Sequence, residues 1–261
     1  MSRLEQTFKE LKKKGRIGLI PYITVGFPNF SVTRDLIKTF DDLGVTAVEL
    51  GVPFSDPLAD GPVIQDASQK ALLKHANLQK TLSLVHQLRH QVSLPIIIMT
   101  YFNIFLRYGL KRVGRDLRNA GVDGIIIPDF FPEDDQAFMK SCRSKNIDQI
   151  LIVSGTTAKK RLESLAKQSR GFVYYATHTG TTGPRDRLPK DVSHNVKKIR
   201  SCTDKPIAVG FGISNRGHIR ELSKCADAAI VGSAVIRVMN SARTPASVVR
   251  NVHRFIKRIW L

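Results

Sequence analysis

The chain has 261 residues, 42% of them hydrophobic, and carries 41 Lys and Arg against 22 Asp and Glu, a formal net charge of +19. This apolar content is enough for a buried core, so the composition excludes an intrinsically disordered chain. The three cysteines have no CxxC spacing and form no even set, which argues against a secreted disulfide framework and a zinc site. The positive charge is typical of proteins that bind polyanions, so nucleic-acid binding is a first hypothesis.

The first segment, residues 2–14, is charged and places Leu4, Phe8 and Leu11 at helical spacing. It lacks the apolar stretch of a signal peptide, so we expect an N-terminal amphipathic helix. No apolar run in the sequence approaches the roughly 20 residues that cross a bilayer. We therefore expect a soluble, cytoplasmic protein that does not act at a membrane.

Short runs of Val, Ile and Leu recur along the rest of the chain, and continuous apolar runs are typical of parallel strands covered on both faces. Several follow a glycine that can end a helix, as Gly44 and Gly121 do. The predicted strands are 19–25, 47–50, 95–99, 124–127, 149–153, 172–175, 206–209 and 228–231. Amphipathic helices are predicted at 36–43, 78–92, 110–120, 134–145, 159–167, 192–200, 217–222 and 246–259.

Eight strand–helix units in about 250 residues are typical of an α/β chain that forms a TIM (β/α)8 barrel. An open dinucleotide-binding sheet is disfavoured, because no GxGxxG follows the first strand. No linker or change of composition divides the sequence. We predict one TIM-barrel domain over residues 1–261 with an extra N-terminal helix, and the chemistry at the carboxyl ends of its strands.

Glu49 lies within an apolar strand, and a carboxyl group buried there is costly unless it is paired or its pKa rises. Such a group serves either as a structural hydrogen-bonding residue or as a proton donor. The long loop after this strand is rich in Pro, Gly and Asp, which favours a functional role. Asp60 in this loop is a candidate second carboxylate, but Asp56 and Asp66 compete with it, and any of the three could shape turns or cap a helix.

Glycine and hydroxyl residues follow the last three strands, at 177–184, 210–214 and 231–234. Together with a helix that begins near Ser233, they predict the phosphate site of a TIM barrel. His178 is better explained as a loop residue than as an acid–base group. No histidines have the spacing of metal ligands, so we predict no metal.

The run ELGVPFSDPLADGPVIQ at residues 49–65 resembles the signature of the tryptophan synthase alpha subunit family. Matching segments occur in order at 21–26, 101–103, 128–129, 180–183 and 210–213. The resemblance implies a TIM barrel that cleaves indole-3-glycerol phosphate by a retro-aldol step, giving indole and glyceraldehyde 3-phosphate in L-tryptophan biosynthesis.

The resemblance also implies the roles of individual residues. Glu49 would be the acid and base at indole C3, and Asp60 would bind the indole nitrogen, held by Thr182 when the loops close. The phosphate would contact Gly183, Gly212, Gly232 and Ser233. Tyr22, Tyr174 and Phe211 would line the indole pocket, although core aromatic residues would look the same in sequence.

Further implications concern partners. The family works without a cofactor of its own beside a pyridoxal-phosphate beta subunit in an alpha2beta2 heterotetramer. The loop with Pro53 and Asp56 would carry part of that contact, and the Phe130–Phe131–Pro132 run departs from the family's usual sequence on a surface that it uses toward the partner. A stand-alone lyase that releases free indole is the first alternative, and a basic nucleic-acid-binding barrel is the second.

The placement of the basic residues weakens this second alternative. Basic residues fall on most of the predicted helices around the barrel. Examples are Lys12, Arg112, Lys160, Lys197 and Arg254. A spread of this kind indicates a solvated surface. We therefore predict that the chain does not bind nucleic acid, and that only Arg185, Arg187 and Lys190 could steer an anionic substrate inward.

Overall fold

The strands of this protein close into a parallel barrel, described in a computed structural model for residues 1–177, 188–189, 191–210 and 212–261. The eight strands are β1 (Gly18–Thr24), β2 (Val48–Gly51), β3 (Ile96–Met99), β4 (Gly124–Ile126), β5 (Asp148–Ser154), β6 (Val173–Ala176), β7 (Ile207–Gly210) and β8 (Ala228–Val231). Each strand pairs in parallel with the next, and β8 pairs with β1. The predicted TIM barrel is confirmed, and every observed strand end lies within one residue of its predicted position.

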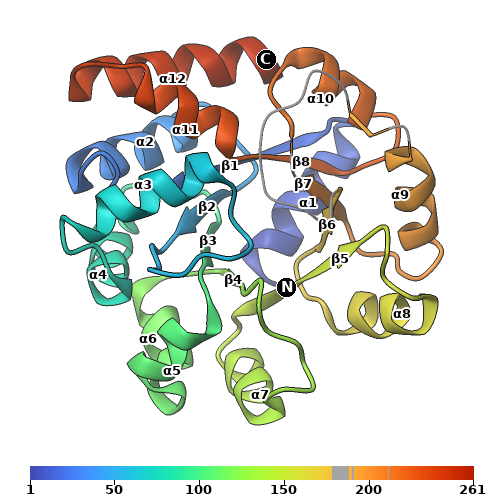
Figure 1. The fold of residues 1–261 in the computed structure, drawn as a ribbon. Coiled ribbons are helices and arrows are strands. Elements are labelled where there is room, and N and C mark those ends of the chain that lie inside the picture. The colour runs from blue at the N-terminus through green and yellow to red at the C-terminus, as the bar shows by residue number, and fades with distance from the viewer. Residues whose placement is uncertain (178–187, 190, 211) are drawn as a thin grey trace.

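Helices surround the barrel (Figure 1). Those in the described residues are α1 (Arg3–Lys13), α2 (Phe30–Asp42), α3 (Pro62–Leu72), α4 (Leu78–Leu88), α5 (Phe102–Tyr108), α6 (Leu110–Ala120), α7 (Gln136–Ser144), α8 (Lys159–Gln168), α9 (Val192–Arg200), α10 (Arg216–Leu222), α11 (Ser233–Asn240) and α12 (Pro245–Trp260). None of them is long and apolar enough to cross a membrane.

Several helices differ from the sequence prediction. Those at Pro62–Leu72 and Phe102–Tyr108 were not predicted, and the helix predicted at 78–92 ends at Leu88. The helix predicted from residue 36 begins at Phe30, because the Asn29 side chain accepts a hydrogen bond from the Val32 amide at 2.9 Å and caps the first turn. The helix after the β2 loop begins at Pro62, with Gly61 as its cap. None of the three candidate aspartates therefore caps this helix, and proline at its first turn fixes where it begins.

The predicted N-terminal helix is confirmed, and it closes the amino-terminal end of the barrel. Leu4 and Phe8 of α1 belong to one apolar cluster with inward-facing residues such as Ile97, Ile126 and Phe172. The Phe8 and Phe172 rings lie 5.5 Å apart. A second, larger cluster lies between the strands and the outer helices. The barrel is thus packed inside and closed at this end, which leaves its carboxyl-terminal end for chemistry.

Candidate active site

Glu49, in β2, is buried in the barrel with an exposed fraction of 1%. It pairs in register with Tyr22 of β1 and Ile97 of β3. Its Oε2 atom has no hydrogen-bond partner among the described residues. Burial, together with the neighbouring Asp60 carboxylate, raises the pKa of Glu49 to about 8. At neutral pH this carboxyl group carries a proton that it can donate.

Asp60 lies in the loop between β2 and α3, and its side chain is buried as well. The Tyr101 hydroxyl donates a hydrogen bond to its Oδ2 at 3.3 Å, and the Gln65 side chain donates to its backbone carbonyl at 2.8 Å. Burial raises the pKa of Asp60 to about 6, and the bond from Tyr101 opposes this rise. Asp60 is therefore largely ionised at pH 7, the opposite state from Glu49.

The two competing aspartates of the sequence analysis lie outside this site. Asp56 is exposed, and its carboxylate accepts a hydrogen bond from the neighbouring Ser55 hydroxyl. Asp66 lies on α3 and forms an ion pair with Lys70 at 2.6 Å. Burial beside Glu49 thus singles out Asp60, because only this aspartate of the three is removed from solvent.

Tyr22 of β1 and Tyr174 of β6 lie at the same end of the barrel and are both buried. Burial is the main cause that raises the pKa of each phenol, followed by the charge of Asp60 for Tyr22 and of Glu49 for Tyr174. The four titratable groups therefore share one buried site. The Tyr22 hydroxyl also lies 3.3 Å from the Thr24 hydroxyl.

Two glycines make room for these rings. A Cβ atom on Gly51 would lie 2.1 Å from the Tyr22 hydroxyl oxygen, and one on Gly210 would lie 2.3 Å from the Tyr174 hydroxyl oxygen. Real side chains do not approach that closely, so any larger residue at either position would displace a tyrosine. The glycine that ends β2 and the glycine that ends β7 thus leave the space that the two tyrosine rings occupy.

Tyr101 is the residue that the sequence reasoning missed. It follows β3, and its hydroxyl accepts a hydrogen bond from the Ala59 amide at 2.9 Å while donating to Asp60. Its ring lies 5.2 Å from that of Phe54, in the same loop as Asp60. Its position could have been anticipated, because the first residues after β3 lie beside the loop that follows the neighbouring strand β2.

Gly232 and Ser233 lie at the junction of β8 and α11, where the predicted helix start at Ser233 is confirmed. Ser233 is the first residue of α11, so the amides of its first turn lack partners within the helix. Gly212 follows β7 with a positive φ of 77°, a backbone conformation that suits glycine. These residues have the arrangement of a barrel phosphate site, but the phosphate contacts stay a prediction.

The remaining predicted residues, Thr182, Gly183 and Phe211, lie outside the described residues, as do His178, Arg185, Arg187 and Lys190. Among the residues that the structure does describe, no group of three or more His, Cys, Asp or Glu side chains is placed to hold a metal ion. The absence of a metal requirement stays a prediction.

Comparisons with known proteins identify the family. The family described as "Tryptophan synthase alpha chain" matches residues 8–259. The Arabidopsis thaliana tryptophan synthase alpha chain is 37% identical over 98% of this chain and 94% of its own length, and the Roseiflexus castenholzii relative is 40% identical over 98% of both.

The fold matches as well. A chain in a Mycobacterium tuberculosis tryptophan synthase structure superposes with a TM-score of 0.90 at 30% identity, covering 100% of this chain and 99% of that one. A mutant alpha subunit from Pyrococcus furiosus gives 0.85 at 30% identity, covering 93% and 97%. The chain belongs to the tryptophan synthase alpha chain family, whose members are lyases that cleave indole-3-glycerol phosphate in tryptophan biosynthesis.

Proposed function

We propose that this chain cleaves indole-3-glycerol phosphate to indole and glyceraldehyde 3-phosphate, with Glu49 as general acid and base and Asp60 as the stabilising carboxylate. One observation carries this assignment. Two buried carboxyl groups share one end of the barrel, and their pKa values of about 8 and about 6 make one of them an acid and the other an anion at neutral pH.

The first step is protonation of the indole ring at C3. The ring then carries a positive charge that can accept the electrons of the bond to be broken. Protonated Glu49 is suited to donate this proton, because its pKa lies near the working pH. Its unpartnered Oε2 leaves a position open for the substrate.

Stabilisation of the resulting cation falls to Asp60. Protonation at C3 places positive charge on the ring nitrogen, and an ionised carboxylate beside the N–H lowers the energy of that state. Tyr101 and the backbone bonds of the loop hold the Asp60 carboxylate in place before the substrate arrives. Asp60 therefore needs no reorganisation at the moment when charge develops.

Cleavage follows when the Glu49 carboxylate removes the proton from the hydroxyl group on the carbon attached to C3. The oxygen electrons form the aldehyde, the bond to C3 breaks, and its electron pair restores the neutral indole ring. Glu49 ends the cycle protonated, as it began, so no redox partner or cofactor of this chain is required.

Substrate contacts follow from the same assignment. Tyr22 and Tyr174, with Phe211, would enclose the indole, and Gly183, Gly212, Gly232 and Ser233 would hold the phosphate. Thr182 would bind Asp60 when the loops close over the substrate and exclude water. The burial of both tyrosines and the start of α11 at Ser233 support these roles.

We further propose a pyridoxal-phosphate beta subunit as partner, in an alpha2beta2 assembly. Apolar surface at the carboxyl-terminal end of the barrel supports a contact there. Leu58, in the loop after β2, is 89% exposed, and Phe131, after β4, is 42% exposed. Asp56 is exposed beside Leu58, whereas Pro53 is buried and would act only by shaping the loop.

The test is an indole-release assay on the full chain with indole-3-glycerol phosphate. We expect indole and glyceraldehyde 3-phosphate in equal amounts, and faster release when a beta subunit is added. No cleavage in either condition would refute the lyase assignment. Full activity of the isolated chain, unchanged by a beta subunit, would instead support the stand-alone lyase.

A further inference from the structure

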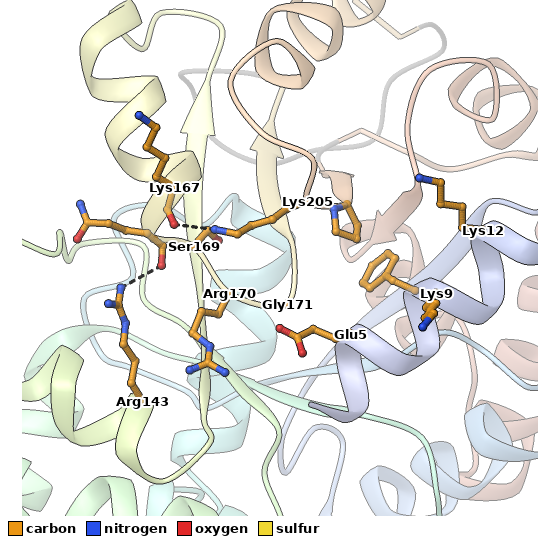
Figure 2. Close-up of a pocket in the computed structure, with 12 residues that line it drawn as sticks. Glu5, Lys9, Lys12, Arg143, Lys167, Ser169, Arg170, Gly171 and Lys205 are labelled. Atoms are coloured by element: carbon orange, nitrogen blue, oxygen red, sulfur yellow. Dashed lines mark hydrogen bonds between the residues drawn. The ribbon is translucent and has the colours of Figure 1, made fainter. Parts of the chain in front are cut away.

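A hollow of about 430 Å³ lies at the amino-terminal end of the barrel, opposite the end that carries Glu49. It is bounded by α1, the end of α7, and the segments that enter β6 and β7 (Figure 2). Phe8 and Pro206 contribute apolar lining. Its volume is within the range of small-ligand sites, about 300–1,000 Å³.

Six cationic side chains line this hollow, and Glu5 is its one carboxylate. Lys9 and Lys12 extend from α1 on one side, and the others lie across the hollow on α7, at the end of α8 and on the segments that enter β6 and β7 (Figure 2). The cations are Lys9, Lys12, Arg143, Lys167, Arg170 and Lys205. The sequence analysis expected the basic residues to be spread around the barrel. These six are an exception, because the fold brings them together from distant parts of the chain.

Hydrogen bonds hold two of these cations in place, and an ion pair holds a third. The Lys205 ammonium donates to the Ala166 and Lys167 carbonyls at 3.0 and 2.6 Å. Arg143 donates to the Gln168 carbonyl at 3.1 Å. Arg170 Nε lies 3.2 Å from Asp148 Oδ1, the only ion pair to these six cations found among the described residues. The positive wall is thus held in position without a ligand.

The positive charge in the hollow is only partly compensated. The Glu5 carboxylate already accepts a hydrogen bond from the Ser2 amide at 2.9 Å, within a helix cap. Burial, followed by repulsion from Arg143 and Arg170, lowers the pKa of Lys205. The buried Nε of Arg143 has no hydrogen-bond partner in the part of the chain that the structure describes. An anion in the hollow would offset the repulsion of Lys205 by Arg143 and Arg170.

Favourable interactions with helix dipoles account for the positions of only some of these cations. Arg143 and Lys167 lie in the last turns of α7 and α8, where cations offset the negative helix end. Lys9 lies in the interior of α1, and Arg170 follows α8 in a loop. These two cations add positive charge that no helix end requires.

We propose that this hollow binds a small soluble anion that carries at least two phosphate groups. The cations lie on two sides of the hollow, so two linked phosphate groups could contact the lysines of α1 and the cations of the opposite wall together. The hollow lies at the other end of the barrel from the predicted substrate phosphate contacts. Binding there is therefore separate from the lyase site.

Isothermal titration calorimetry of inorganic triphosphate into the full chain at low salt tests this proposal. The probe variant Lys9→Gln/Lys167→Gln removes one charge from each side of the hollow. The control Lys13→Gln/Lys224→Gln removes two charges from exposed lysines that do not line it. We expect the probe variant to weaken triphosphate binding about tenfold or more, and the control variant less than about twofold. Orthophosphate should bind more weakly than triphosphate.

Three results would overturn the proposal. Undiminished binding to the probe variant would place the anion elsewhere, and equal losses in both variants would attribute binding to net charge. Binding of a short single-stranded RNA without binding of triphosphate would make the surface a nucleic-acid site. Thermal unfolding confirms that each variant is folded. The indole-release assay on the same variants should give the wild-type rate, so a failure of the lyase assignment is seen separately.

Discussion

The two ends of the barrel treat buried carboxyl groups in opposite ways. At the amino-terminal end, Asp123 lies within ion-pair distance of Arg3 and Arg89, and Asp148 lies beside Arg170. Burial raises the pKa of both aspartates, and their arginines oppose this rise. At the carboxyl-terminal end, Glu49 and Asp60 have no ion pair among the described residues, and their pKa values rise to about 8 and about 6. A buried carboxylate beside arginine holds segments of the chain together, whereas the two carboxyls without a cation remain available for the proposed roles of acid and stabilising anion.

The substitution with the largest expected effect is Glu49→Gln, which tests the carboxyl-terminal pair directly. The amide keeps the size of the side chain but has no proton to transfer, so kcat should fall by about 10³-fold or more while KM changes little. Single-turnover assays with indole-3-glycerol phosphate measure the effect. Asp66→Asn, on the exposed face of α3, is the matched control and should leave kcat unchanged. Near-normal turnover by Glu49→Gln would remove Glu49 from the mechanism.

Asp60→Asn tests the anionic member of the pair. Loss of the charge should lower kcat about 10²–10³-fold, because the developing cation loses its partner. Asp56→Asn, in the same loop but exposed, should keep most of the activity. The same assay separates them, and equal losses in the two variants would show that the loop, rather than the Asp60 charge, matters.

Arg89→Met tests the buried ion pair with Asp123 at the amino-terminal end of the barrel. It leaves the buried Asp123 with one of its two arginines, and we expect a loss of about 3 kcal/mol in the free energy of unfolding by urea. Arg34→Met, which breaks the exposed pair with Asp35, should cost less than about 1 kcal/mol. Comparable losses would mean that burial does not decide the strength of these pairs.

The pH profile of kcat/KM should be bell-shaped. Activity should rise as pH increases through about 6, where Asp60 becomes ionised, and fall through about 8, where Glu49 loses its proton. Outside these limits the slope should approach tenfold per pH unit. A profile that is flat between pH 5 and 9 would contradict the division of roles between the two carboxyls.

The smallest expected effect is that of Tyr101→Phe. It removes the hydrogen bond to Asp60, so the pKa of Asp60 should rise and the acidic limb of the profile should move to higher pH. At pH 7 we expect a loss of about fivefold in kcat/KM, within the value of one hydrogen bond. An unchanged acidic limb would show that Tyr101 serves packing alone.

Local sequence patterns determined the barrel and the position of its first buried carboxyl. Continuous apolar runs place all eight strands, and a carboxyl within the second run marks Glu49, because burial of such a group requires compensation. The sequence shows glycines at positions 51 and 210, but it does not show why a larger residue would not fit there. They leave space for Tyr22 and Tyr174, which arrive from other strands.

Only the tertiary structure shows which residues that are far apart in the sequence come into contact. Two features distinguish Asp60 from Asp56 and Asp66. Its side chain is buried, and it accepts a hydrogen bond from Tyr101, which lies 41 residues away in the sequence. The cations of the amino-terminal hollow come from four separate segments, so sequence spacing could not show that they meet. A strand is specified by its own residues, whereas pairing, burial and shared charge are properties of neighbours that folding brings together.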